Sequence, residues 1–297
     1  MEEEIVISVK GLSQRYGKGR IIYDNLSFDV PKGRILGLLG KNGTGKTTTI
    51  NILMGYLRPQ SGVCKIFGED ITKMSAATRE RIALLLEGHV QYAFMTIGQI
   101  ERFYSQFYKK WNRAAYYELM EKLKVTPDQK LSSMSCGQRS QVALGLILAQ
   151  NADLLVLDDF SLGLDPGYRR LFTDYLREYA KAENKTVFMT SHIIQDMERL
   201  VDDCIILDYG RILVQKSVKE LMDTFHRYAF TAADCSALES DSRLYSTSRI
   251  RENCETFSFE TGEAVRKILE EKAIEYKDLR QEKLSLEDIF IGLTGKY

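Results

Sequence analysis

Several features that mark common protein classes are scarce in this chain of 297 residues. Only 4 prolines leave little room for a proline-rich linker. The 41 basic residues balance 41 acidic ones, so no net charge draws the chain to nucleic acid or to an anionic membrane. No apolar run reaches the roughly 20 residues that span a bilayer. The nearest candidate, 142–157, is interrupted by Gln150, Asn151 and Asp153.

The five cysteines are widely spaced and form no CxxC pair, which predicts reduced thiols and no zinc site. The N-terminus is acidic where a signal peptide would be basic, and it alternates as a strand does. The remaining composition, 44% hydrophobic and 28% charged, is typical of a globular chain with one large or two modest domains. We therefore expect a soluble intracellular protein.

The pattern of the first half predicts an α/β domain. Apolar and polar residues alternate over the first 30 positions, as they do in half-buried antiparallel strands. Residues 34–40 form an apolar run, which predicts a strand buried on both faces. A glycine-rich turn and a helix over 47–57 follow it. Strand, glycine loop and helix in this order open an α/β domain.

Helical patterns come next. Residues 97–126 carry aromatic and charged residues at helical spacing, which predicts a helical insertion. Residues 138–149 are apolar on almost every face and predict a deeply buried helix. Four short β-rich runs follow, the first two in the central sheet and the last two closing the domain: 154–157, 186–189, 204–207 and 212–214.

After Gln215 the chain has no further strong motif. Its pattern predicts two strands and a helix, and then a last helix that opens with a capping box at Ser285. The expected elements are 228–230, 256–259, 263–272 and the helix from Ser285. Together they indicate a small α+β accessory domain.

Residues 40–47, GKNGTGKT, match the pattern G-x-x-x-x-G-K-[ST]. Glycines let successive backbone N–H groups turn inward around an anion, and the following helix N-terminus adds its dipole. Lys46 can then reach the β- and γ-phosphates of a nucleotide, and the Thr47 hydroxyl can ligate Mg²⁺. A plain glycine turn is the alternative, which the flanking strand and helix disfavour. The residues expected to hold the nucleotide here are Gly40, Asn42, Gly43, Gly45, Lys46, Thr47 and Thr48.

Three further polar segments follow in order: 135–138 (SCGQ), 158–166 (DDFSLGLDP) and 190–192 (TSH). Together with the phosphate loop, they resemble the nucleotide-binding subunits of ABC transporters over roughly 1–215. The segment 286–295 resembles, more weakly, the accessory domain of bacterial ABC exporters.

The resemblance implies an α/β fold built on the P-loop NTPase sheet, with an antiparallel β subdomain and a helical insertion at about 88–145. An ABC-type nucleotide-binding domain is expected over 1–214 and the accessory domain over 215–297. ATP and Mg²⁺ are the expected ligands.

The resemblance also implies a role for single residues. Tyr16 stands where relatives stack an aromatic ring on adenine, although a core tyrosine is the alternative. Asp158 is expected to hold Mg²⁺ with Thr47, and Asp159 to be the general base that activates water. His192 is expected to contact the γ-phosphate rather than to be a structural histidine.

In this family one segment faces the nucleotide bound to the opposite subunit. In this chain the segment contains Ser135, Gly137 and Gln138. Asp165 is also expected to take part in nucleotide binding. Ser135 is also a good helix N-cap, and capping and phosphate contact use the same geometry. Each nucleotide would then lie between two subunits, so dimerisation is part of the expected mechanism.

Four positions depart from the usual family residues, which are Glu, Gln, Gly and Pro: Asp159, Glu87, Cys136 and Phe160. Asp159 loses one methylene of reach, so we expect hydrolysis that is slow but present. Glu87 either offers an oxygen to Mg²⁺ and to the nucleotide or is a solvated loop carboxylate. Cys136 either crowds the phosphate across the dimer or is an inert small residue.

The leading hypothesis is an ATPase subunit that pairs with a second nucleotide-binding subunit, identical or paralogous, and powers a separate transmembrane exporter. It would lie in the cytoplasm, on the inner face of the membrane through that permease. A regulatory clamp that binds ATP but barely hydrolyses it is the second hypothesis. A member that acts on DNA or ribosomes is disfavoured, because the chain has one P-loop, no sustained heptad and no basic patch.

One cluster of aromatic residues in the helical insertion could include an exposed docking patch, but most of them are expected in the core. The cluster comprises Tyr92, Phe94, Phe103, Tyr104, Phe107, Tyr108 and Trp111.

Overall fold

The computed structural model describes residues 4–17, 19, 21–86, 92–160 and 164–295. The chain divides into two compact units, Met1–Ile212 and Leu213–Tyr297. The division falls two residues before the boundary expected from the sequence.

The first unit contains two sheets. The antiparallel sheet has the order β2 (Ile21–Pro31), β1 (Ile5–Arg15), β4 (Ser61–Ile66) and β5 (Glu69–Asp70). The second sheet has the order β10 (Arg211–Ser217), β9 (Asp203–Asp208), β3 (Ile35–Gly40), β8 (Thr186–Thr190), β7 (Leu154–Leu157) and β6 (Ile82–Leu85). The division between the units falls within β10, after Ile212. Strands β9, β3, β8, β7 and β6 pair in parallel.

Strand β3 is central in the parallel sheet, between β8 and β9, and its apolar residues are buried. The prediction of a strand buried on both faces is therefore confirmed. One apolar core contains residues of both sheets. In it, Phe28 of β2 stacks on Phe188 of β8 with ring centroids 5.9 Å apart. The carboxyl end of β3, which carries the glycine loop, is thus fixed by strands on both sides.

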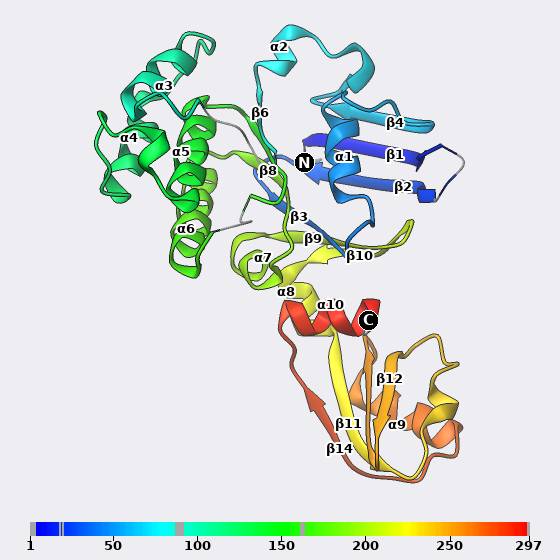
Figure 1. The fold of residues 1–297 in the computed structure, drawn as a ribbon. Helices are drawn as coiled ribbons and strands as arrows, with labels where there is room; N and C mark the ends of the chain where they lie inside the picture. Colours follow the sequence, from blue (N-terminus) through cyan, green and yellow to red (C-terminus); the bar gives the residue numbers. More distant parts are fainter. Residues whose placement is uncertain (1–3, 18, 20, 87–91, 161–163, 296–297) are drawn as a thin grey trace. The chain divides into compact units, whose positions relative to one another are not determined.

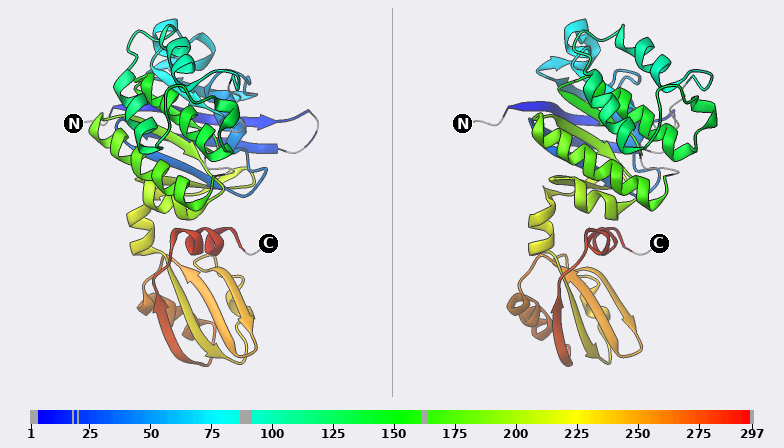
Figure 2. Two further views of the ribbon diagram at one scale, coloured as in Figure 1. Left: turned by 60° about the vertical axis from the view of Figure 1, so that its left-hand side comes forward. Right: turned by 90° about the vertical axis from the view of Figure 1, so that its left-hand side faces the viewer.

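The first unit has these α-helices: α1 (Lys46–Leu53), α2 (Ala76–Arg79), α3 (Ile97–Ser105), α4 (Arg113–Lys122), α5 (Cys136–Ala149), α6 (Pro166–Ala182) and α7 (Ile194–Leu200). Helix α1 stops four residues before the predicted end, where Gly55 turns the backbone to a φ of 75°. Helices α3 and α4 form the predicted insertion and pack on α5, to one side of the strands (Figure 1). The two views of Figure 2 show α5 and α6 running side by side.

Helix α5 is buried along most of its length, which confirms the prediction from its apolar composition. In the first unit, six sequence runs that we did not assign to elements form β4, β5, α2, β6, α6 and α7. Strand β6 lies at the edge of the parallel sheet beside β7 and extends the sheet toward the insertion.

The expectation that most of the insertion's aromatic cluster is core is wrong. Phe94 is 71% exposed, Phe107 65% and Tyr92 47%, and the other members are only partly buried. The rings pack mainly on one another, since the centroid of Phe103 lies 5.2 Å from that of Phe107 and 5.5 Å from that of Tyr92. Only Phe103 and Tyr104 lie on α3, and the other rings come from the segments before and after it. Helical spacing in the sequence does not supply a neighbour to cover them.

Up to residue 295, where the described part of the chain ends, the second unit is a four-stranded antiparallel sheet with three α-helices. The strand order is β12 (Tyr245–Ile250), β13 (Asn253–Ser258), β11 (His226–Ala232) and β14 (Tyr276–Glu282). The helices are α8 (Val218–Thr224), α9 (Gly262–Glu271) and α10 (Leu286–Thr294). Val265 and Ile268 of α9 pack in one apolar cluster with Tyr228 of β11. At the start of α10 the Ser285 hydroxyl accepts the N–H of Asp288, as its position in the sequence predicted.

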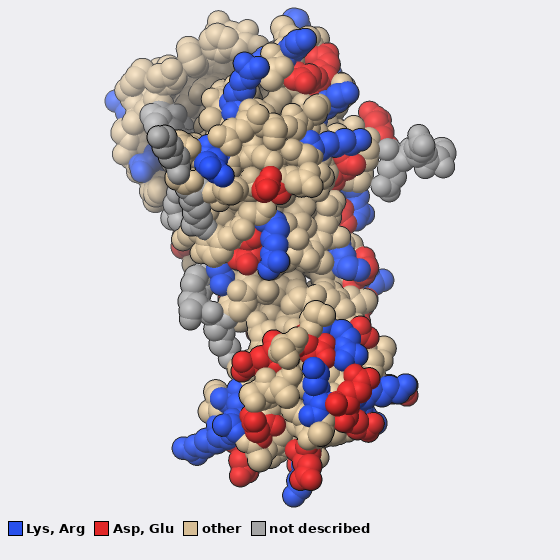
Figure 3. Space-filling model, turned by 90° about the vertical axis from the view of Figure 1, so that its right-hand side faces the viewer, with Lys and Arg blue, Asp and Glu red and all other residues tan. Residues whose placement is uncertain are grey.

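Charged side chains of both signs are interspersed on the face shown in Figure 3, with no broad area of a single sign. Within the described parts of the chain, no helix combines the length and apolarity that crossing a bilayer requires. All five cysteines are free thiols, and only Cys136 is exposed.

Candidate functional site

The glycine loop runs from the end of β3 to the start of α1. Gly43 and Gly45 have φ angles of 77° and 104°, which side chains rarely allow. A Cβ on Gly45 would also lie 2.5 Å from Cγ2 of Ile22. Gly45 is the N-cap of α1 and supplies no side-chain hydrogen bond, so the first N–H groups of the helix are left for another acceptor. The loop therefore has the geometry of an anion cradle.

The ammonium group of Lys46 lies inside this loop. It donates to the backbone oxygen of Gly40 at 2.7 Å and to that of Lys41 at 3.2 Å, and the side chain is buried. Burial lowers the pKa of Lys46, and the negative charges of Asp159 and Asp158 partly oppose this shift. A buried cation held by neutral carbonyls favours an anionic ligand, because a phosphate supplies the missing counter-charge.

The carboxylate of Asp158 follows β7 and meets the start of α1. Its Oδ1 accepts a hydrogen bond from the Thr47 hydroxyl at 3.3 Å and one from the Thr190 hydroxyl at 2.7 Å. Asp158 is buried, whereas Thr47 is exposed. A carboxylate and a hydroxyl that converge in this way are the hard oxygen donors that suit Mg²⁺, so the residues present fit that ion.

Asp159 and His192 form a pair beside this carboxylate. Nε2 of His192 lies 2.8 Å from Oδ2 of Asp159, and the His192 backbone N–H donates to Oδ1 at 3.3 Å. Asp159 is 5% exposed and has a φ of 43°, in the left-handed region, while the His192 side chain is 41% exposed. The imidazole thus reaches solvent, and the carboxylate lies beneath it.

Tyr16 follows β1 and reaches the first turn of α1. Its hydroxyl lies 3.2 Å from the Thr48 hydroxyl, and half of its surface is exposed. The core alternative for Tyr16 is therefore wrong. The ring stands at the edge of the phosphate loop, where a planar group could lie against it.

The segment at the start of α5 forms a capping box. The Ser135 hydroxyl accepts the N–H of Gln138 at 3.2 Å, and the Gln138 side-chain oxygen accepts the N–H of Ser135 at 3.0 Å. Ser135 and Cys136 are exposed, whereas Gly137 is buried and a Cβ there would lie 3.1 Å from the Tyr168 ring. The N-cap role of Ser135 is confirmed, and the side chain of Gln138 is engaged in the same cap.

The remaining positions singled out in the sequence are Asp165, Glu87 and Phe160. The carboxylate of Asp165 caps α6, accepting the N–H groups of Gly167 at 2.9 Å and Tyr168 at 3.1 Å. Glu87 lies outside the described residues. Phe160, where the family has proline, is buried and stacks on Phe172 with ring centroids 4.4 Å apart.

Sequence reasoning missed the part that Thr190 plays. Its hydroxyl contacts Asp158 and also accepts the N–H of Asp159 at 3.0 Å. The available signal was a hydroxyl residue at the carboxyl end of a strand that precedes His192, since parallel strands bring such ends to one edge of the sheet.

Comparison with known proteins decides the family. A family model described as "ABC transporter" matches residues 23–161. The Nod factor export ATP-binding protein I of Ralstonia nicotianae is 32% identical over 222 residues, which cover 73% of this chain and 68% of that protein. The chain belongs to the ATP-binding proteins of ABC transporters.

Other ABC transporter proteins are similar over different lengths. The uncharacterized ABC transporter ATP-binding protein YhcH of Bacillus subtilis is 28% identical over 98% of this chain and 96% of its own. A solved structure described as an ATP-binding subunit of an ABC transporter has a TM-score of 0.64 and 25% identity. It covers 73% of this chain and 92% of that one. As a member of this ATPase family the chain binds ATP, and its fold is that of the ABC cassette.

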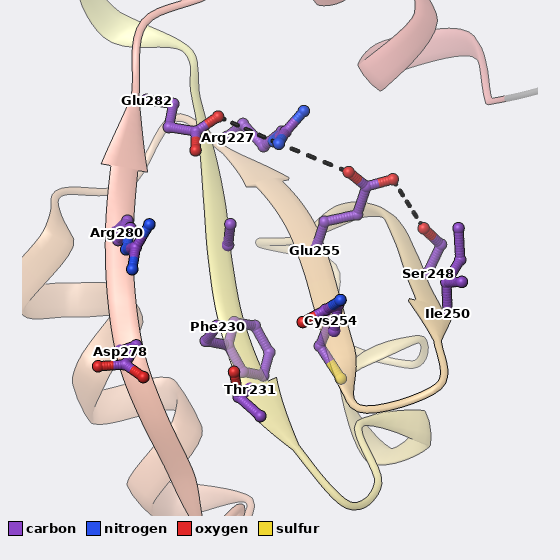
Figure 4. A pocket seen from close by; sticks show the side chains of 12 residues that line it. Arg227, Phe230, Thr231, Ser248, Ile250, Cys254, Glu255, Asp278, Arg280 and Glu282 are labelled. Carbon is purple, nitrogen blue, oxygen red and sulfur yellow. Dashed lines mark hydrogen bonds and ion pairs between the residues drawn. The ribbon is translucent and has the colours of Figure 1, made fainter.

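The second unit also has a cavity, of about 520 Å³, on one face of its sheet (Figure 4). The charged side chains there are largely paired with each other. Arg227 lies 3.2 Å from Glu282 and 3.7 Å from Glu255, and Ser248 donates to Glu255 at 2.9 Å. None of the nucleotide-binding motifs of the ABC family contributes to this cavity.

Proposed function

We propose that this ABC protein hydrolyses ATP at the edge of its parallel sheet and thereby drives a separate transmembrane exporter. The observation that carries the proposal is the convergence of Lys46, Thr47, Asp158, Asp159 and His192 around the end of β3. The name of the Ralstonia relative, which refers to export, supports the direction of transport.

Each residue has a role in this proposal. The phosphate loop and Lys46 hold the β- and γ-phosphates, and Tyr16 lies against the adenine. Thr47 and Asp158 hold Mg²⁺, which when bound neutralises charge on the phosphate oxygens. His192 orients the attacking water, Asp159 accepts its proton, and the water oxygen bonds to the γ-phosphorus as the bond to the β-phosphate oxygen breaks.

The Asp159–His192 contact has a consequence for this chemistry. A carboxylate 2.8 Å from an imidazole nitrogen shares one of its oxygens with that ring. We infer that the exposed imidazole turns toward the γ-phosphate when ATP binds, which releases Oδ2 of Asp159 for the water. The shorter side chain of Asp159 then makes proton transfer slow.

The site is completed by a second nucleotide-binding subunit, identical or paralogous. Ser135 and Cys136 are exposed at the start of α5, where uncapped N–H groups can approach the γ-phosphate held by the partner. With Asp165 and Gly137, they form the half-site that one chain offers to the other. The side chain of Cys136 in this half-site is a further reason to expect slow turnover.

The transmembrane subunit is proposed to dock between β6 and the helical insertion. A groove of about 390 Å³ lies there, lined by Leu84 of β6, Tyr104 of α3, Leu146 of α5 and Tyr56 after α1, among others. Tyr56 is 66% exposed, and the exposed aromatic cluster is part of the same insertion. This docking would hold the chain at the inner face of the membrane.

The experiment is steady-state ATPase of the purified chain, alone and with a co-expressed candidate membrane subunit. We expect slow hydrolysis that Lys46→Ala abolishes and that Lys65→Ala, an exposed lysine on β4, leaves unchanged. Tyr56→Arg should prevent co-purification with the membrane subunit without changing basal turnover. Tyr209→Arg, at a residue 52% exposed in the same unit, is its control.

A regulatory clamp is the second candidate, favoured by the departures at Asp159 and Cys136. It predicts ATP-dependent dimerisation without turnover above the Lys46→Ala blank. If ATP and Mg²⁺ produce neither turnover nor a dimer in light scattering, even with a paralogue present, both candidates are wrong.

A further inference from the structure

We propose that the Thr190 hydroxyl is a positioning group that sets both carboxylates of the site, Asp158 and Asp159. The inference rests on the proposed ATPase function and adds a residue outside the expected set. Thr190 touches neither phosphate nor water in this proposal; it acts through the two aspartates.

The geometry begins with the sheet register. Strands β7 and β8 are parallel, and Leu157 pairs with Met189, so the residues that follow them lie side by side. Thr190 is the last residue of β8 and is 1% exposed. Its hydroxyl is therefore held against the start of the loop that carries both aspartates.

The two hydrogen bonds of this hydroxyl run in opposite directions. Oγ1 donates to Oδ1 of Asp158 at 2.7 Å and accepts the backbone N–H of Asp159 at 3.0 Å. A hydroxyl has one hydrogen and two lone pairs, so both contacts are made at once. Thr190 thereby joins the carboxylate expected to hold the metal to the backbone of the expected base.

The contact to Asp159 fixes a backbone that would otherwise move. Asp159 has a φ of 43°, a conformation that residues with a Cβ rarely adopt. The direction of its carboxylate toward His192, 2.8 Å away, depends on this conformation. An aspartate has one fewer torsion than a glutamate with which to correct an error, so its backbone position matters more.

The contact to Asp158 orients the other carboxylate. Its Oδ1 receives hydrogen bonds from Thr190 on one side and Thr47 on the other. When the Thr47 hydroxyl turns to a metal ion, the Thr190 bond still keeps this carboxylate in place. Loss of that bond would weaken the binding of Mg²⁺ before it weakened the binding of the nucleotide.

The test uses Thr190→Val, which keeps the shape and removes the hydroxyl, and Thr190→Ser, which keeps the hydroxyl. The matched control is Thr186→Val on the same strand. Thr186 is also 1% exposed, and its hydroxyl also accepts a backbone N–H, that of Gly33 at 3.0 Å, at the other end of β8. Circular dichroism verifies that all three variants fold.

We expect Thr190→Val to lower kcat about tenfold to a hundredfold, with KM for ATP changed less than threefold. The Mg²⁺ concentration that gives half-maximal turnover should rise severalfold. Thr190→Ser should recover most of both losses, and Thr186→Val should lie within twofold of the wild-type chain.

Binding supplies a readout that does not depend on turnover. In calorimetric titrations, Mg²⁺ should strengthen ATP binding less in Thr190→Val than in Thr190→Ser or Thr186→Val. The proposal is overturned if Thr190→Val matches Thr186→Val in this gain and in kcat, or if serine is as damaging as valine. If the wild-type chain shows no turnover above Lys46→Ala, the proposed function fails, and the Mg²⁺-dependent gain alone decides the role of Thr190.

Discussion

Replacing Asp159 by glutamate tests how the reach of the expected base limits the rate. The change adds one methylene, about 1.5 Å of reach, to a side chain whose Oδ2 now lies 2.8 Å from His192. A base displaced by about 1 Å costs on the order of a hundredfold in rate. A glutamate carboxylate that reaches closer to the attacking water should therefore recover part of this loss of rate.

Two costs oppose this gain. Asp159 is 5% exposed, and an extra methylene in a packed site costs about 1–3 kcal/mol unless a neighbour gives way. The left-handed backbone at Asp159 also suits aspartate better than glutamate. The side chain that contacts Asp159 is His192, which is 41% exposed and can turn outward. We therefore expect the packing cost of the extra methylene to be near the lower end of this range.

We therefore expect Asp159→Glu to raise kcat about tenfold and to lower the free energy of unfolding by about 1 kcal/mol. The assay is ATPase turnover at saturating ATP and Mg²⁺, together with urea denaturation. Asp159→Asn, which removes the base but preserves the size, should fall to the Lys46→Ala blank. A glutamate variant slower than the wild-type chain would refute the argument that reach limits the reaction.

Three further changes test other parts of the molecule. Tyr16→Ala should raise KM for ATP about fivefold or more with kcat within twofold, and Tyr16→Phe should not, because stacking needs only the ring; steady-state kinetics measure both. Glu101→Gln should lower the free energy of unfolding by about 1–3 kcal/mol, because buried Glu101 lies 3.0 Å from Nε of Arg113 and the amide keeps an acceptor for the Trp111 indole N–H but loses the negative charge. The fluorescence of the only tryptophan reports unfolding, and an unchanged urea midpoint would contradict this. The hydrogen bond from Arg243 lowers the pKa of Asp241 from 3.8 to about 2, so the stabilisation by Asp241 is present above pH 3.8 and lost as the pH falls toward 2. Asp241→Asn should accordingly lower the urea midpoint at pH 7, measured by circular dichroism. Near pH 2 the midpoints of the variant and the wild-type chain should converge, and a difference that persists there would argue against the ion pair.

Much of the fold could be predicted because its signals are local. The buried strand β3, the glycine loop and the apolar helix α5 each follow from a continuous stretch of sequence, and each is where it was expected. Helix α6 had local signals as well, since Asp165 caps it and Pro166 occupies its first turn. These signals are enough to predict a helix there without any long-range contact, although we did not include it among the predicted elements.

Other features depended on contacts that no local pattern records. The aromatic rings of the insertion have helical spacing whether or not a neighbour covers them, and in this unit they remain partly exposed. Strand β6 is short, and only its pairing with β7 makes it part of the sheet.

The chain's residue order alone determined the chemical inventory of the site: a lysine in a glycine loop, two consecutive carboxylates, and a histidine after a strand. The tertiary structure decided how these groups meet. The order β3, β8, β7 brings Thr47, Asp158 and Thr190 together although they are far apart in the sequence. Local sequence sets which groups can bind or transfer a proton, but hydrogen bonds between distant strand ends arise only when the sheet forms, because pairing and register fix those positions.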